Sequence, residues 1–435
     1  MRSIIIFVLF LAAIPFVFTR PYVGVYLWSL FGYLNPHRLT WGFTYDFPFA
    51  LIVAAVTLIG TALTRDRTAP PMTSVVAIWL ALIAWMCITT LFSIDSEQAM
   101  VEWNRTMKIQ LFSFLTIILI NSREKLRTLI WVIALSIGFY GIKGGLFAIA
   151  TGASHRVWGP FGSFIFDNNA IGLAFLMTIP LQWYLLKTAK HRKVRYAMTA
   201  SIVLTIIATL ATHSRGAFLG LVTITMAWLI NEKKKWLMIL FLAIAAPATV
   251  VLMPESWMER METVRNYEQD TSAMGRIYAW RFAIEFSGKR LTGGGYGAFT
   301  EENYRRYSPG IAAEIDERNT GFQNAHSIYF SALGDHGIPG LLLFLALGAL
   351  TLKRSRMVQA IALQQGDTDL ATLAAATRIG LIGYAVSGAF LNLAYFDLYY
   401  HLVAVIVIIE RQLTMDNVAH PVAAARPATA TGWLR

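Results

Sequence analysis

The sequence is poor in charged residues and nearly free of cysteine. Of its 435 residues only 14% are charged, whereas about 25% is usual for soluble proteins. Hydrophobic residues make up 56%, which is more than a soluble fold of this length can bury. These two values exclude a soluble enzyme, a disordered protein and a fibrous protein.

Several motifs are also absent. With Cys87 as the single cysteine, no intrachain disulfide and no cysteine-based metal cluster can form. No HExxH, CxxC, Walker or GxGxxG pattern occurs at the required spacing. The alternating strands of an outer-membrane barrel are missing, and long continuous apolar runs replace them. We therefore expect an all-α polytopic membrane protein.

Twelve apolar segments are predicted to cross a bilayer, which takes about 20 residues each, with a range near 17–25. The first ends at Thr19-Arg20-Pro21, which is not a small-residue cleavage site, so it is interpreted as a retained span and not a signal peptide. Residues 22–34 are shorter and are predicted to lie at the membrane interface. The twelve segments are 3–19, 47–64, 73–92, 106–120, 128–150, 168–186, 196–212, 217–230, 236–253, 326–352, 372–391 and 397–411.

Lys and Arg are unevenly shared between alternate short loops, so the net charge of +12 is read by position and not as a nucleic-acid patch. One set holds most of them, whereas the other holds isolated arginines. This bias predicts that the first set and both termini are cytoplasmic. The rich set comprises Arg65, Arg67, Arg123, Lys125, Arg127, Lys187, Lys190, Arg192, Lys193, Arg195, 233–235, Lys353, Arg354 and Arg356; the poor set comprises Arg20, Arg38, Arg105, Arg156 and Arg215.

One loop, residues 254–325, is long enough to be a domain on the non-cytoplasmic side. It separates spans within 1–253 from spans within 326–412, and an Ala-, Pro- and Thr-rich tail, 413–435, is predicted to be disordered. Within the loop, capping residues predict a helix over 273–286, which the glycines of 293–297 follow as a turn.

Four groups of residues on the predicted outer side are candidates for chemistry, because polar groups at span ends are costly unless they have a use. Arg215, in a short turn, can fork two hydrogen bonds onto a phosphate, or it can anchor the helix in lipid headgroups. Arg276 lies near a helix N-terminus that also favours an anion, or it is a solvated surface arginine. His326 can accept a proton near neutral pH, or it can cap a span.

The fourth group spans Gly141-Ile142-Lys143-Gly144-Gly145 to Asp167-Asn168-Asn169. Its candidates for substrate binding are Lys143, Arg156, Asn168 and Asn169. The alternative is that the glycines serve helix packing and Asp167 caps a helix. Cations and a histidine on one face of the membrane predict group transfer from a lipid diphosphate to an alcohol. In that reaction the arginines neutralise the leaving group and the histidine takes the proton of the attacking hydroxyl.

The chain resembles the superfamily of bacterial O-antigen ligases and O-antigen polymerases. The resemblance rests on Ser214-Arg215-Gly216, Gly275-Arg276 with Trp280, Gly293 to Gly297 with Phe299, and His326 with Gly337-Ile338-Pro339-Gly340. The stretch from Gly141 to Asn169 is similar to the O-glycosylation ligase subgroup associated with exosortase systems.

The resemblance implies a GT-C-type glycosyltransferase of about twelve transmembrane helices with one large periplasmic loop that contains helices. Such an enzyme of the inner membrane moves a glycan from undecaprenyl diphosphate to lipid A–core oligosaccharide, inverts the anomeric centre, and needs no metal or other cofactor. Arg215 and Arg276 would bind the diphosphate, and His326 would be the base. Relatives often have Glu where this chain has Asp335, so the resemblance gives Asp335 and His336 no role.

Alternatives remain open at this point. A glycan polymerase shares the donor chemistry and differs in its acceptor, and a ligase of the subgroup could glycosylate a protein hydroxyl. A lipid or glycan transporter is the more distant alternative, because it predicts charges near the membrane midplane and paired broken helices, and no inverted repeat is evident in the sequence.

Overall fold

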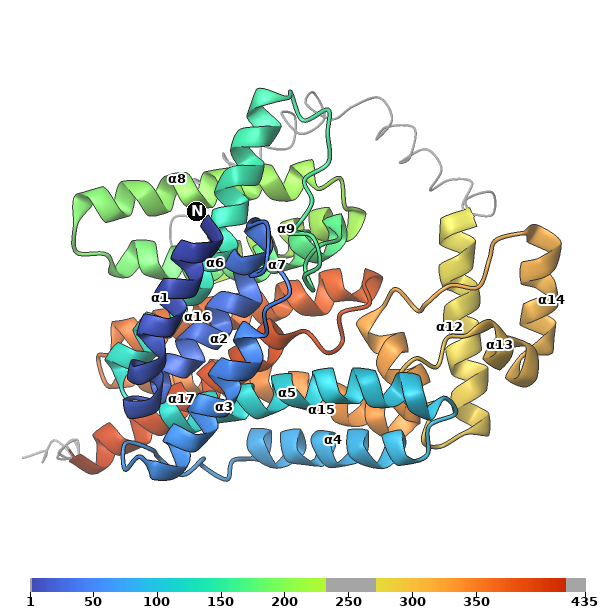
Figure 1. The fold of residues 1–435 in the computed structure, drawn as a ribbon, viewed down its shortest axis with the longest axis horizontal. Helices are drawn as coiled ribbons and strands as arrows, with labels where there is room; N and C mark the ends of the chain where they lie inside the picture. The colour runs from blue at the N-terminus through green and yellow to red at the C-terminus, as the bar shows by residue number, and fades with distance from the viewer. Residues whose placement is uncertain (1, 232–270, 420–435) are drawn as a thin grey trace, which may run out of the picture.

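The computed structural model describes residues 2–231 and 271–419, and throughout these two ranges all regular structure is helical (Figure 1). The prediction of an all-α polytopic membrane protein is confirmed. Eight of the described helices are long and apolar enough to cross a membrane, and two shorter apolar helices, Phe49–Leu63 and Arg215–Leu229, accompany them. The predicted span 236–253 lies outside the described residues.

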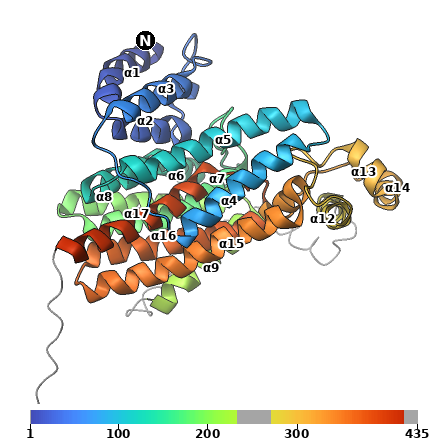
Figure 2. The ribbon, with the colours of Figure 1, turned by 90° about the horizontal axis from the view of Figure 1, so that it is seen from below.

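The first three helices form a small aromatic-rich group. These are α1 (Arg2–Thr19), α2 (Tyr22–Tyr33) and α3 (Phe49–Leu63), and Figure 2 shows them on one side of the remaining bundle. The segment predicted to lie at the membrane interface forms α2, which packs against α3 and α6, and its interfacial position stays a prediction. Its Trp28 ring stacks on Phe112, with 3.9 Å between ring centroids. Helix α2 has 12 residues, which is too short for a predicted span, and its buried face packs in the bundle.

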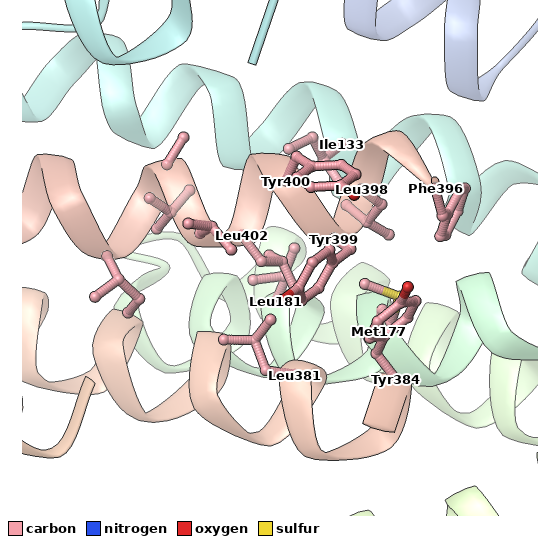
Figure 3. Close-up of a cluster of buried hydrophobic side chains, with 14 of the residues drawn as sticks. Ile133, Met177, Leu181, Leu381, Tyr384, Phe396, Leu398, Tyr399, Tyr400 and Leu402 are labelled. Carbon is pink, nitrogen blue, oxygen red and sulfur yellow. The ribbon is translucent and has the colours of Figure 1, made fainter. Parts of the chain in front are cut away.

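The main bundle contains nine of the described helices. Its centre is formed by α7 and α17, in which 83% of the most apolar stretch is buried, against 11% in α1. A helix that is apolar all round is stable in that central position. Figure 3 shows this core, where the rings of Tyr384 and Tyr399 stack 4.5 Å apart. The nine are α4 (Ser74–Leu91), α5 (Ser96–Leu119), α6 (Arg123–Ala150), α7 (Asn168–Thr188), α8 (Arg192–Ala211), α9 (Arg215–Asn231), α15 (Ile328–Gln364), α16 (Thr368–Ser387) and α17 (Asp397–Ala419).

Two boundaries differ from those expected. Helix α5 begins ten residues before the predicted span 106–120, and its extra turns carry Glu97, Glu102 and Arg105, which mask it in a hydropathy scan. Helix α17 continues to Ala419, so residues 413–419 of the predicted disordered tail are helical, and 420–435 lie outside the described residues.

The loops predicted to be rich in cations gather at one end of the bundle. Lys125 contacts Asp66 at 2.8 Å, and Arg123 contacts Asp367 at 2.5 Å. Arg354, from the far end of α15, reaches Glu410 on α17 at 3.0 Å. Since these loops are far apart in sequence, their contacts support the alternation of the helices that the charge pattern predicts.

The described part of the long loop folds as a helical unit with its own core. It contains α12 (Thr271–Lys289), α13 (Glu301–Tyr307) and α14 (Pro309–Arg318), so the predicted helix 273–286 is confirmed and slightly longer. Phe282 and Tyr304 stack 4.0 Å apart in its centre. Two-pronged ion pairs link its helices: Arg281 on α12 bonds to Glu314 on α14 at 2.7 and 2.9 Å.

Candidate functional site

His326 lies in the link between the loop unit and α15, and α12 holds that link on both sides. The indole Nε1–H of Trp280 donates to the carbonyl oxygen of Ala325 at 2.7 Å. The Trp280 ring also stacks on Phe330, with 5.0 Å between centroids and 11° between planes. His326 itself has φ of +43°, an uncommon conformation for a non-glycine residue. The chain on both sides of His326 is therefore held by α12, and the His326 side chain is half-buried.

Arg276 precedes Trp280 by four residues on α12, so the two lie on the same helix face. Burial lowers the pKa of His326 below its ordinary 6.5, and the positive charge of Arg276 lowers it further. The neutral imidazole, which can accept a proton, is thus the form favoured at neutral pH. Gly275 beside Arg276 lets the end of the Gln323 side chain approach α12, because an added Cβ would lie 2.4 Å from that side chain.

The N-terminus of α7 supplies a charge of opposite sign. Asp167 caps α7 by accepting from the backbone N–H of Asn169 at 2.8 Å, as the alternative reading of the sequence predicted. Its carboxylate raises the pKa of His326, opposing burial and Arg276. The segment Asp167-Asn168-Asn169 therefore lies close enough to His326 to influence its protonation.

Arg215 stands on a turn that is tied to the same end of α7. The buried side chain of Asn168 donates from Nδ2 to the carbonyl oxygen of Thr212 at 2.8 Å. Ser214 then caps α9 by accepting from the backbone N–H of Ala217 at 3.2 Å, which leaves Arg215 as the exposed first residue of the helix. Asn168 thus links the Arg215 turn to the segment whose Asp167 acts on His326.

Arg156 lies near the Arg215 turn in the chain fold, whereas Lys143 lies on the exposed face of α6. The segment that carries Arg156 runs beside the Arg215 turn, because Val157 donates its backbone N–H to Ala211 at 2.9 Å. Lys143 is exposed on α6, and no interaction described for it leads to the histidine or the arginines. The glycines beside it pack helices: a Cβ at Gly145 would lie 2.3 Å from the carbonyl oxygen of Leu204 on α8. Substrate binding by Lys143 and Arg156 stays a prediction.

The two glycine motifs of the loop and of α15 meet. Gly337 has φ of +67° and breaks α15, and a Cβ there would lie 2.0 Å from the carbonyl oxygen of Leu291. The backbone N–H groups of Gly294 and Gly295 donate to the carbonyls of Gly334 and Asp335 at 3.0 and 2.9 Å. The turn at 293–297 is therefore a docking joint for the broken helix.

Beside this joint is a polar pocket of about 370 Å³ that our reading of the sequence did not predict. Its innermost acid, Asp335, accepts from the backbone N–H of Ala298 at 3.3 Å and from the phenol of Tyr395 at 3.0 Å. Glu102 and Arg105 of α5, 3.6 Å apart, form one wall. The only sequence signals were these paired charges ahead of an apolar run and an acid just before the Gly337 break. The lining residues are Gln98, Glu102, Arg105, Tyr296, Gly297, Phe299, Asn324, Ser331, Asp335, Asn392, Ala394 and Tyr395.

His336, the neighbour of Asp335, has a packing role. It is buried, and its Nδ1 lies 2.7 Å from the hydroxyl of Thr89 on α4. Its carbonyl oxygen accepts from the indole of Trp85 at 2.8 Å. Within residues 2–231 and 271–419 no three His, Cys, Asp or Glu side chains are grouped so that they could hold a metal ion.

Two protein families match parts of the chain. Residues 200–345 match the family described as O-Antigen ligase, a range that contains Arg215, Arg276, His326 and both glycine motifs. Residues 200–345 therefore carry an O-antigen ligase domain, which supports the O-antigen ligase superfamily and a membrane glycosyltransferase of the ligase and polymerase type. Residues 1–190 match a family of unknown function, and no curated protein matches the chain. The narrower resemblance to the exosortase-associated subgroup stays a prediction.

Proposed function

We propose that the protein transfers a glycan from undecaprenyl diphosphate to a hydroxyl group of lipid A–core oligosaccharide. The observation that carries the proposal is the setting of His326, a half-buried imidazole between the opposing charges of Arg276 and Asp167. The O-antigen ligase domain contains Arg276 of α12 and His326 of the link to α15, and it supports the same chemistry.

In the proposed reaction His326 takes the proton of the acceptor hydroxyl, and the acceptor oxygen forms a bond to the anomeric carbon. The bond from that carbon to the diphosphate oxygen breaks, and undecaprenyl diphosphate leaves with the electron pair. Attack on the face opposite the leaving group inverts the anomeric centre. Arg215 and Arg276 stabilise the charge that develops on the diphosphate, and this fixed electrostatic help requires no metal.

The membrane in which this occurs is, in our proposal, the bacterial inner membrane. The cation-rich end of the bundle would face the cytoplasm together with both termini, in keeping with the positive-inside rule. His326 and the two arginines would then face the periplasm, where the lipid-linked donor and the lipid A–core acceptor are both accessible.

Reconstitution of the full-length protein with undecaprenyl-diphosphate oligosaccharide tests the proposal. Three acceptors should be offered in parallel: lipid A–core, a second lipid-linked glycan and a hydroxyl-bearing protein. We expect product on lipid A–core alone. Product only on the second glycan would identify a polymerase, product only on the protein a protein O-oligosaccharide ligase, and transport without a new glycosidic bond a transporter.

A variant pair tests the proton acceptor. His326→Ala should abolish transfer while the protein still inserts and remains monodisperse in size-exclusion chromatography. The matched control is His191→Ala, an exposed histidine at the N-terminus of α8 that should leave transfer unchanged. Full turnover by His326→Ala would remove the proposed base.

A further inference from the structure

The pocket beside the glycine joint has walls from four separate parts of the chain. Helix α5 supplies Gln98, Glu102 and Arg105, and the loop unit supplies Gly297 and Phe299. The link around His326 and the start of α15 form a third wall, and residues 392–395, just before α17, form the fourth. A volume of about 370 Å³ is in the size range of pockets that hold small ligands.

The lining suits a hydroxyl-rich, uncharged ligand. Two carboxyl groups and one guanidinium face the pocket, so a diphosphate placed there would meet more negative than positive side chains. Amides of Gln98, Asn324 and Asn392 both donate and accept, which matches sugar hydroxyls, since these also do both. The rings of Tyr296 and Tyr395, with centroids 5.0 Å apart, add apolar surface for the C–H face of a pyranose.

The interior of the pocket is held rigidly, which favours specific recognition. Asp335 is 6% exposed and is fixed by donors from two different segments, Ala298 and Tyr395. Ser331 donates to Asn392 Oδ1 at 3.1 Å, which ties α15 to the segment before α17. Arg105 is held from outside the pocket lining, because its guanidinium carbon lies 3.5 Å from the centre of the Phe164 ring. A preorganised set of donors and acceptors loses little entropy when a ligand binds.

The pocket adjoins the proposed base. Asn324, on its rim, precedes His326 by two residues, and Ser331 follows it by five. Arg276 acts electrostatically on His326 from α12, and neither Arg276 nor Arg215 is among the residues that line the pocket. A sugar in the pocket would therefore be separate from the groups proposed to hold the diphosphate.

From these observations we infer that the pocket is the binding site for the sugar ring of the acceptor that carries the attacking hydroxyl. Glu102 and Asn392 bond to its hydroxyls, and Asp335 positions the walls. This inference rests on the proposed function for the reaction, but not for the binding of the sugar itself.

The test measures the KM of each substrate separately in full-length reconstituted protein. Glu102→Gln and Asn392→Ala should each raise the KM for core oligosaccharide about tenfold, which corresponds to the loss of one strong hydrogen bond, and leave the KM for the lipid-linked donor unchanged. The matched controls, both on α5, are Glu97→Gln and Asn104→Ala. Both residues are exposed and outside the pocket, and neither KM should change.

Titration calorimetry with core oligosaccharide alone separates this inference from the proposed function. The wild-type protein could bind the oligosaccharide without transferring glycan, while Glu102→Gln binds it about tenfold more weakly. That result would support the sugar-binding pocket and refute the proposed transfer reaction. If Glu102→Gln and Asn392→Ala raise only the donor KM, the acceptor assignment is overturned in favour of a donor sugar. Unchanged KM values and unchanged affinity in both pocket variants would refute the assignment of the pocket as a sugar-binding site.

Discussion

Trp280 of α12 donates a hydrogen bond to Ala325, the residue immediately before His326, and stacks its ring on Phe330 four residues after it. One side chain of the loop unit thus spans the segment that carries the proposed base. The arrangement explains why Gly275-Arg276 and Trp280 occur together: one helix face brings a cation near the imidazole and also holds the backbone around it.

Trp280→Phe should lower kcat while preserving the fold. The substitution keeps an aromatic ring on Phe330 but removes the indole N–H, so the Ala325 carbonyl loses its donor and the His326 backbone is less constrained. A neutral hydrogen bond contributes about 1 kcal/mol, so we expect roughly a five- to tenfold loss. Steady-state kinetics with Trp158→Phe, at an exposed tryptophan, as control checks this; an unchanged kcat would show that the bond does not position the base.

The pH profile of kcat/KM should move in opposite directions in two charge variants. The rate falls as pH falls through the pKa of His326, because the protonated imidazole cannot accept a proton. Arg276 lowers that pKa, so Arg276→Gln should move the acid limb to higher pH. Asp167 raises it, so Asp167→Asn, which keeps a capping side chain, should move the limb to lower pH.

The position of the limb, and not the size of the rate, is the quantity to compare in that experiment, since Arg276→Gln is also expected to weaken donor binding. Glu97→Gln, in the first turn of α5 and not among the charges that act on His326, provides a charge-neutralising control whose limb should not move. Shifts of the same sign in both variants would mean that a group other than His326 titrates.

Arg215→Lys should weaken the donor site without loss of folding. Lysine keeps the charge but cannot form the two parallel hydrogen bonds of a guanidinium to phosphate. We expect the KM for undecaprenyl-diphosphate glycan to rise about tenfold, which equals about 1.4 kcal/mol. The control is Arg195→Lys on the cation-rich side; an unchanged donor KM in Arg215→Lys would leave Arg215 as a membrane anchor only.

Gly337→Ala should destabilise the protein more than the same change at another glycine of positive φ. Gly366 has φ of +75° with nothing within 4 Å of an added Cβ, so Gly366→Ala should cost about 1 kcal/mol from backbone strain alone. At Gly337 the Cβ would also collide with Leu291, so the loss should exceed that of the control. Thermal unfolding of both variants in detergent measures the difference, and equal midpoints would contradict the tight joint.

The sequence predicted what depends on neighbouring residues and missed what depends on tertiary contacts. The helix at 273–286 followed from local caps and a glycine stop, and it appears as α12. The early turns of α5 escaped a hydropathy scan because Glu102 and Arg105 face the polar pocket. The pocket itself needs four distant segments side by side, and no local pattern specifies that.

The candidate site divides in the same way. Residue chemistry and order led to the prediction of Arg215, Arg276 and His326 as site residues. The fold links the Arg215 turn to Asn168 and brings Asp167 and Arg276 near enough to His326 to act on its charge. For Lys143 the sequence could not say which face of a glycine-rich helix packs inward. The glycines of α6 take the α8 side, and the lysine is left exposed.

The glycine joint has a mechanical consequence. Besides its bonds to α15, Gly294 accepts from the backbone N–H of Ile94 in the turn between α4 and α5. The loop unit is thereby joined at one point both to the turn between α4 and α5 and to the break in α15. A hinge motion there would break backbone hydrogen bonds on both sides. In the proposed reaction, a donor whose tail stays in the bilayer would then enter laterally between the transmembrane helices while the loop unit stays in place.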